Sequence, residues 1–184
     1  MLGGMSEVGL KIPAQKLGSR IMKVNHAGEH GAVNIYAGQI FMARLTAPKL
    51  VAELEEFKRH EEGHRAIFKA ELERRNQPRC RSYFLCAFGG RVLGLITGLF
   101  GRSAIAVTTV AVERVVLKHL QEQVEVLGAS DAHAVAAINA IIEDEQHHHD
   151  ASADHVQPSG FWSRVLTPIV SASTETVIWL GMRL

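Results

Sequence analysis

Two short segments of the sequence carry a glutamate and a histidine three residues apart, a spacing that places both side chains on one face of a helix. They are "HEEGH", with Glu61 and His64, and "EDEQHHHD", with Glu145 and His148. Carboxylate oxygens combined with imidazole nitrogens suit iron or manganese better than a soft metal. We therefore expect both segments to contribute to a metal site.

Both pairs interrupt an apolar stripe of helical periodicity. The first stripe comprises Leu50, Leu54, Phe57, Phe68 and Leu72, with Glu61 and His64 in its gap. The second comprises Ala134, Ile138 and Ile141, followed by Glu145 and His148. The two carboxylates are thus predicted to face the core, where an unpaired charge is strongly disfavoured. A cation between the two carboxylates removes this conflict.

Two further glutamates complete a repeated pattern. Glu29 and Glu113 each lie on an apolar stripe, and each precedes a Glu-x-x-His glutamate by 32 residues, so the two halves are offset by 84 residues. A helix giving Glu, then a helix giving Glu-x-x-His, repeated once, is the ligand set of ferritin-like di-iron or di-manganese bundles. The predicted metal ligands are Glu29, Glu61, His64, Glu113, Glu145 and His148.

Helical phase separates the ligands within the segment 143–150 from their neighbours. Glu143, His147 and His149 are expected to point away from the site. Asp144 has two readings, as an acid that accepts a hydrogen bond from a ligand histidine or as a solvated surface acid. We assign no role to the remaining histidines, which are His26, His30, His60, His119, His133 and His155.

The elements that must position these residues are predicted to be helices. Apolar periodicity and turn residues indicate helices over about 19–45, 48–76, a third ending at 127, 131–155 and 161–184. Long helices with short connections predict an all-α fold, a ferritin-like antiparallel four-helix bundle with additional apolar helices. We expect one domain over 1–184, with a poorly structured segment at 1–18 and a C-terminal apolar helix at 160–184.

The composition argues against one class of partner and for another. The net charge of +1 gives no sign of nucleic-acid binding. A hydrophobic content of 47% and a mean hydropathy of +0.05 suggest apolar surface that meets a membrane or a partner. Residues 83–100 are expected to form an interfacial helix, with a buried core helix and a transmembrane helix as alternatives. The spacing of Gly90, Gly94 and Gly98 allows close helix contact.

Four blocks of the sequence resemble the demethoxyubiquinone hydroxylases, ferritin-like di-iron monooxygenases of ubiquinone biosynthesis. The blocks are "VNHAGEHGAVNIYAGQ" (24–39), "HEEGH" (60–64), "TVAVERVVLKH" (109–119) and "EDEQHHHDASADH" (143–155). The resemblance implies hydroxylation of a polyprenylated demethoxy-benzoquinol by O₂ at two iron ions bound by the six residues named above. It implies electrons from the quinol itself or from NADH. Leu120 departs from the family, where some members carry a tyrosine.

The resemblance also implies a location and partners. We expect a peripheral membrane protein on the cytoplasmic face of a bacterial inner membrane, or alternatively on the matrix face of the mitochondrial inner membrane. The expected partners are the polyprenyl quinone, the membrane surface, other proteins of ubiquinone biosynthesis and a second copy of the chain. Two other functions stay open, a ferritin-like ferroxidase or iron-handling protein and a non-enzymatic lipid-binding scaffold with a structural metal.

Overall fold

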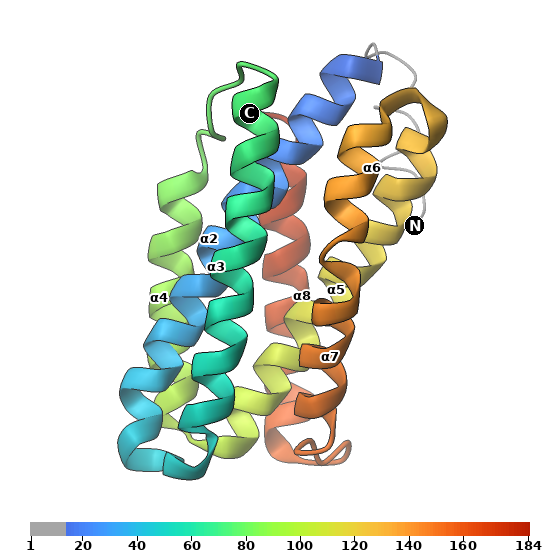
Figure 1. The fold of residues 1–184 in the computed structure, drawn as a ribbon. Helices are drawn as coiled ribbons and strands as arrows, with labels where there is room; N and C mark the ends of the chain where they lie inside the picture. The colour runs from blue at the N-terminus through green and yellow to red at the C-terminus, as the bar shows by residue number, and fades with distance from the viewer. Residues whose placement is uncertain (1–13) are drawn as a thin grey trace.

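The computed structural model describes residues 14–184, and within this range the chain is helical without a strand (Figure 1). The helices are α2 (Ala14–Thr46), η1 (Pro48–Leu50), α3 (Val51–Arg74), α4 (Tyr83–Leu99), α5 (Arg102–Leu127), η2 (Gly128–Asp131), α6 (Ala132–Asn139), α7 (Ile142–Ala153) and α8 (Phe161–Gly181). The prediction of an all-α bundle with additional apolar helices is confirmed.

The bundle consists of two similar halves. In the first half α2 packs against α3, and in the second α5 packs against α6 and α7, which follow one another along the same side of the molecule (Figure 1). Each half ends in an apolar helix that packs on the first helix of that half: α4 on α2, and α8 on α5. The 84-residue repeat seen in the ligand spacing therefore extends to the order of the helices.

The apolar stripes predicted from the sequence form the interior of the bundle. Every position of the α3 stripe is buried, including Glu61 and His64, and so is every position from Ala134 to His148 in the second stripe. Burial of these stripes is the main favourable contribution to packing the helices together. The same packing brings the four helices that carry the candidate ligands face to face.

The N-terminal boundary differs from the prediction. Helix α2 begins at Ala14, so the expectation of a poorly structured segment over 1–18 is wrong for residues 14–18. Residues 1–13 lie outside the described range. The first turns of α2 extend the amphipathic pattern of the bundle, since Leu17 and Ile21 are both buried in the core.

The predicted helix over 131–155 is broken in two. Helix α6 ends at Asn139 and α7 begins at Ile142, and at the break the Ile141 amide donates to the Ile138 carbonyl over 3.2 Å. No glycine or proline marks this position, so local propensity gives no warning of it. Ile138 and Ile141 are both fully buried, which indicates that tertiary packing imposes the tight turn.

The glycines of α4 let this helix approach α2 closely. A Cβ atom added at Gly90 would lie 2.3 Å from the Gly31 carbonyl oxygen, and one added at Gly94 would lie 2.1 Å from that of Ile35. Neither separation is possible for real atoms, so only glycine fits. The predicted close helix contact is confirmed.

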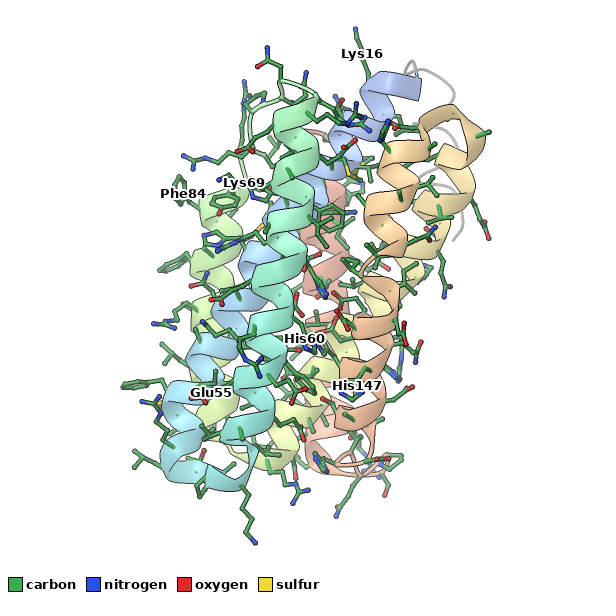
Figure 2. The ribbon with its side chains drawn as sticks, in the orientation of Figure 1. Lys16, Glu55, His60, Lys69, Phe84 and His147 are labelled. Carbon is green, nitrogen blue, oxygen red and sulfur yellow. The ribbon has the colours of Figure 1, made fainter. Side chains whose placement is uncertain are left out.

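The opposite face of α4 is apolar and exposed. It carries Phe84, Leu85, Phe88, Val92, Ile96 and Leu99, and Figure 2 shows Phe84 on the outer side of the bundle. Residues 83–100 are therefore not a buried core helix. Among residues 14–184, no single helix has both the length and the apolarity to cross a bilayer, although one bent pair, Arg102–Asn139 with Ile142–Ala153, meets this test by length and composition.

Candidate metal centre

The structure brings all six predicted ligands together in the middle of the bundle. One cluster consists of Glu29, Glu61, His64 and Glu145, and the other of Glu61, Glu113, Glu145 and His148. Within each cluster the potential ligand atoms lie within 4.8 Å of one another. Glu61 and Glu145 belong to both clusters, as expected of carboxylates that lie between two cations.

The repeated Glu-x-x-His pairs approach each other from α3 and α7. The Nδ1 atom of His64 lies 2.9 Å from Glu145 Oε1 and 3.6 Å from Glu61 Oε2. The Nδ1 atom of His148 lies 3.2 Å from Glu61 Oε1 and 3.9 Å from Glu145 Oε2. Each histidine therefore directs Nδ1 at the carboxylates of both halves, and its Nε2 away from them.

These atoms fit a pair of cations. Both oxygens of Glu61, Oε1 of Glu145 and the Nδ1 atoms of His64 and His148 are buried without a hydrogen bond of acceptable geometry. Buried polar atoms without partners are costly, and here all of them face the same small region. Two divalent cations would give each of these atoms a partner and would balance the charge of the four carboxylates.

Burial and mutual electrostatic interactions shift the pKa values of several of these candidate ligands. Burial, followed by repulsion from neighbouring carboxylates, raises the pKa of Glu29 and of Glu113 well above the ordinary value. Burial opposes a charged His64, but Glu145 and Glu61 outweigh it and raise its pKa to about 10. Burial likewise opposes a charged Glu61, but His148 and His64 outweigh it and lower its pKa. Binding of metal would displace protons from Glu29, Glu113 and His64.

Three further polar side chains, those of Asp144, Tyr36 and His60, contact these six residues. Asp144 Oδ2 lies 3.0 Å from His64 Nε2, which supports its role as a hydrogen-bond partner of a ligand histidine rather than as a solvated acid alone. The hydroxyl of Tyr36 donates to Glu113 Oε1 over 3.1 Å. His60 Nδ1 lies 3.0 Å from His148 Nε2. The sequence prediction gave no role to Tyr36 or His60.

The other polar residues of the segment 143–150 lie outside the cluster. Glu143 and His147 are exposed, and His149 pairs with Asp150 over 2.9 Å. Of the remaining histidines, His119 bonds to Glu175 and His155 to Arg102. Helical phase thus predicted which side chains of this segment face the cluster and which face away from it.

An apolar cavity of about 480 Å³ leads from the carboxylates to the surface. Glu29, Glu61, Glu113 and Glu145 line it at the cluster. Apolar side chains from α2, α4, α5 and α8 form most of the remaining wall, and Leu120 is one of them. Several of the α4 residues that line it are also exposed, so the cavity opens between apolar helices. A cavity of this size accommodates a substituted aromatic ring.

Comparison with known proteins identifies the family. Residues 16–181 match the family described as "Ubiquinone biosynthesis protein COQ7". The chain is a member of this family.

Several relatives within the COQ7 family support the assignment. The chain is 31% identical over 186 residues to the NADPH-dependent 3-demethoxyubiquinone 3-hydroxylase, mitochondrial, of Dictyostelium discoideum, covering 97% of this chain and 83% of that protein. It is 31% identical over 166 residues to the 3-demethoxyubiquinol 3-hydroxylase of Rhodospirillum rubrum, covering 89% and 77%. The human NADPH-dependent 3-demethoxyubiquinone 3-hydroxylase, mitochondrial, is 31% identical over 172 residues, which cover 90% of this chain and 77% of the human protein.

Membership in the COQ7 family confirms the resemblance drawn from the four sequence blocks. The relatives are named as hydroxylases, so the prediction that the chain belongs to a family of oxygen-inserting enzymes is also confirmed. The names of the Dictyostelium and human relatives mention NADPH, whereas the nicotinamide expected from the sequence is NADH.

Proposed function

We propose that this chain hydroxylates the ring of a polyprenylated demethoxyubiquinol at a di-iron centre, as a step of ubiquinone biosynthesis. One observation supports this proposal above the others: an apolar cavity ends at the buried cluster of carboxylates and imidazoles. A hydrophobic ring substrate and a site for two hard cations would thus meet in one place.

Each ligand has a distinct role in this proposal. Glu61 and Glu145, which belong to both clusters, would hold both iron ions. Glu29 with His64 would complete one iron site, and Glu113 with His148 the other. When bound, such an iron pair supplies the chemistry of O₂ reduction, which protein side chains lack.

The reaction needs a reductant that supplies two electrons to O₂. One oxygen atom of O₂ enters the ring in place of a hydrogen, and the other leaves as water after taking up two electrons and two protons. The named dependence of several relatives on NADPH supports a nicotinamide as the source of these electrons, with NADH and the quinol itself as the alternatives predicted from the sequence.

The protein itself positions the ring and keeps water out. The cavity wall is mostly apolar, which favours the ring and its first isoprene units over water. Two polar side chains in the wall, Asn25 and Gln123, bond to each other over 2.8 and 3.1 Å and so are satisfied without water. Their amide groups offer both a donor and an acceptor type to the oxygen substituents of a ring.

The surface around the cavity supports association with a membrane. Leu85, Phe88, Val92 and Ile96 of α4, and Val177 of α8, are exposed and also line the cavity. A polyprenyl chain dissolved in a bilayer could enter between these helices without crossing water. We propose a peripheral association of this face with the cytoplasmic side of a bacterial inner membrane or the matrix side of the mitochondrial one.

The same cavity disfavours the two alternative functions. A ferroxidase or iron store needs a polar path along which hydrated iron reaches the site, and this path is apolar. A scaffold with a structural metal needs no cavity that ends at the metal ligands. The hydroxylase is therefore the function that the arrangement supports best.

A labelling experiment tests the proposal. Iron-loaded protein is supplied with a demethoxyubiquinol, NADPH and heavy-isotope O₂, and the product is analysed by mass spectrometry. We expect a hydroxylated quinol that carries one heavy oxygen atom. The variant Glu145→Ala should form none, whereas Glu143→Ala, an exposed acid in the same helix, should retain activity. Product without heavy oxygen, or full activity of Glu145→Ala, would contradict the proposal.

A further inference from the structure

The two candidate ligand histidines differ in the group that holds their outer nitrogen. His64 Nε2 lies 3.0 Å from a carboxylate oxygen of Asp144. His148 Nε2 lies 3.0 Å from the Nδ1 atom of His60. Figure 2 shows His60 on α3, on the side that faces α7. The Nε2 atom of the histidine thus faces a carboxylate in one half of the site and an imidazole in the other.

His60 and Asp144 occupy equivalent positions of the repeat. Each is the residue immediately before the glutamate of a Glu-x-x-His pair, and the two are separated by the 84 residues that relate the halves. Each side chain reaches across from its own helix to the ligand histidine of the other half. The crossing arrangement is therefore symmetric, and only the identity of the outer group breaks the symmetry.

The geometry fixes the direction of both hydrogen bonds once metal is bound. A histidine that binds metal through Nδ1 keeps its proton on Nε2 and donates it outward. Asp144 accepts this proton with a charged carboxylate. His60 accepts it at its Nδ1 atom, and its ring lies within 16° of the plane of the His148 ring. A bond to a carboxylate is the stronger of the two.

We propose that His60 is a positioning residue that makes the two metal positions chemically unequal. This inference rests on the proposed di-iron function. The carboxylate of Asp144 makes His64 the more electron-rich ligand, whereas His60 orients His148 without adding charge. The metal beside His64 and Glu29 is therefore the more readily kept in the oxidised state.

A second contact acts in the same direction. The Tyr36 hydroxyl donates to Glu113, a ligand of the metal position that His148 serves. A donated hydrogen bond withdraws electron density from a carboxylate ligand. Both contacts therefore leave the position of Glu113 and His148 poorer in electrons than its counterpart.

Mössbauer spectroscopy of protein loaded with the active iron isotope tests this inference. We expect two resolved quadrupole doublets of equal area in the wild type. The variant His60→Asp gives both histidines a carboxylate partner, so the separation between the doublets should narrow. The variant His60→Gln keeps a neutral acceptor, so its spectrum should stay close to that of the wild type.

An anaerobic ferrous titration gives a second readout. Removal of the acceptor in His60→Ala should weaken one of the two iron sites by about 10–100-fold and leave the other unchanged. His147→Ala is the matched control, because His147 is an exposed neighbour on α7. It should bind both irons as the wild type does.

The outcomes separate this inference from the proposed function. A wild type that binds two irons with indistinguishable doublets would overturn the inequality alone, as would His60→Asp with an unchanged spectrum. A wild type that cannot bind two irons would overturn the proposed function and this inference with it. If His60→Ala does not fold, the comparison of His60→Asp with His60→Gln still decides the matter, since both variants keep a side chain at this position.

Discussion

A single hydrogen bond, from Tyr36, holds the carboxylate of Glu113 in the candidate site. Tyr36 is fully buried, packs edge-on against Phe57 and places its hydroxyl 3.1 Å from Glu113 Oε1. Burial, together with the nearby Glu113, raises the pKa of Tyr36 well above its ordinary value, so the hydroxyl stays a donor. This hydrogen bond fixes the orientation of the Glu113 carboxylate.

The variant Tyr36→Phe should bind one iron more weakly by about 10-fold, because the orienting donor is lost while the apolar packing of the ring is kept. Competition with a chelator of known affinity measures the change. Tyr83→Phe is the matched control, since this second tyrosine lies at the start of α4 outside the ligand set. Equal affinities in the two variants would contradict the role of Tyr36.

At the scale of elements, α4 is held on α2 by a face of glycines. Gly94 is the tightest of these contacts, because an added methyl group would meet the backbone of Ile35 at 2.1 Å. Gly89 lies on the same helix, and an added Cβ there meets no atom within 4 Å. Substituting alanine at each position therefore separates the effect of helix packing on stability from that of intrinsic helix propensity.

The variant Gly94→Ala should lower the free energy of unfolding by about 1–3 kcal/mol, because α4 must move away from α2. The variant Gly89→Ala should raise it by about 0.5–1 kcal/mol, because alanine favours the helix and nothing obstructs it. Denaturant titration monitored by circular dichroism compares the two. A stabilising Gly94→Ala would show that the close approach of the two helices is not needed.

The start of α6 depends on an ion pair that is sensitive to acid. Asp131 accepts from the Ala134 amide at the helix start and receives two hydrogen bonds of 2.7 Å from Arg75, which also donates to Glu71. The bond from Arg75 lowers the pKa of Asp131, and that from Arg74 lowers the pKa of Glu71. A lowered carboxyl pKa contributes stability that is present above the unfolded value and lost as pH falls.

We expect the free energy of unfolding to fall as pH drops below about 4.5, and Asp131→Asn to flatten that fall. Asparagine can still accept from the Ala134 amide, so the variant removes the ion pair and keeps the cap. At neutral pH it should cost about 1–3 kcal/mol. Denaturant titrations across this pH range provide the measurement, and an unchanged slope in Asp131→Asn would assign the acid sensitivity to other groups.

How far the sequence predicts these elements depends on where the determining contacts lie. The clustering of the candidate ligands was predictable because Glu61, His64, Glu145 and His148 lie on apolar stripes within single helices, and spacing alone reveals such stripes. The break between α6 and α7 was not predictable from the sequence, because packing around Ile138 and Ile141 causes it. His60 was missed because its partner lies on another helix, although its 84-residue offset from Asp144 was a usable signal.

At the scale of the whole molecule, the two halves present apolar helices in equivalent places. Helices α4 and α8 each pack on the first helix of their half, and each leaves large apolar side chains exposed, such as Phe84 and Phe88 on α4 and Ile169 and Trp179 on α8. The cavity runs between these helices to the candidate ligands. The repeat that builds the candidate metal site thus also builds an apolar surface beside the cavity that leads to it.

The double variant Phe84→Ser and Phe88→Ser should bind phospholipid vesicles at least about 10-fold more weakly than the wild type. Each substitution removes the favourable free energy of transferring a phenylalanine side chain from water into the membrane. Vesicle flotation measures this. Val126→Ser, an exposed position on α5, is the control. Undiminished flotation of the double variant would exclude this face as the contact surface.

The central claim is that one repeated pattern of residues holds two iron ions in each chain, and an iron count tests it most directly. Protein loaded anaerobically with ferrous iron and freed of excess metal should contain about two irons per chain. Glu61→Ala, which removes a ligand shared by both positions, should lose the pair, whereas Glu62→Ala should keep it. Two irons in Glu61→Ala, or none in the wild type, would contradict the account.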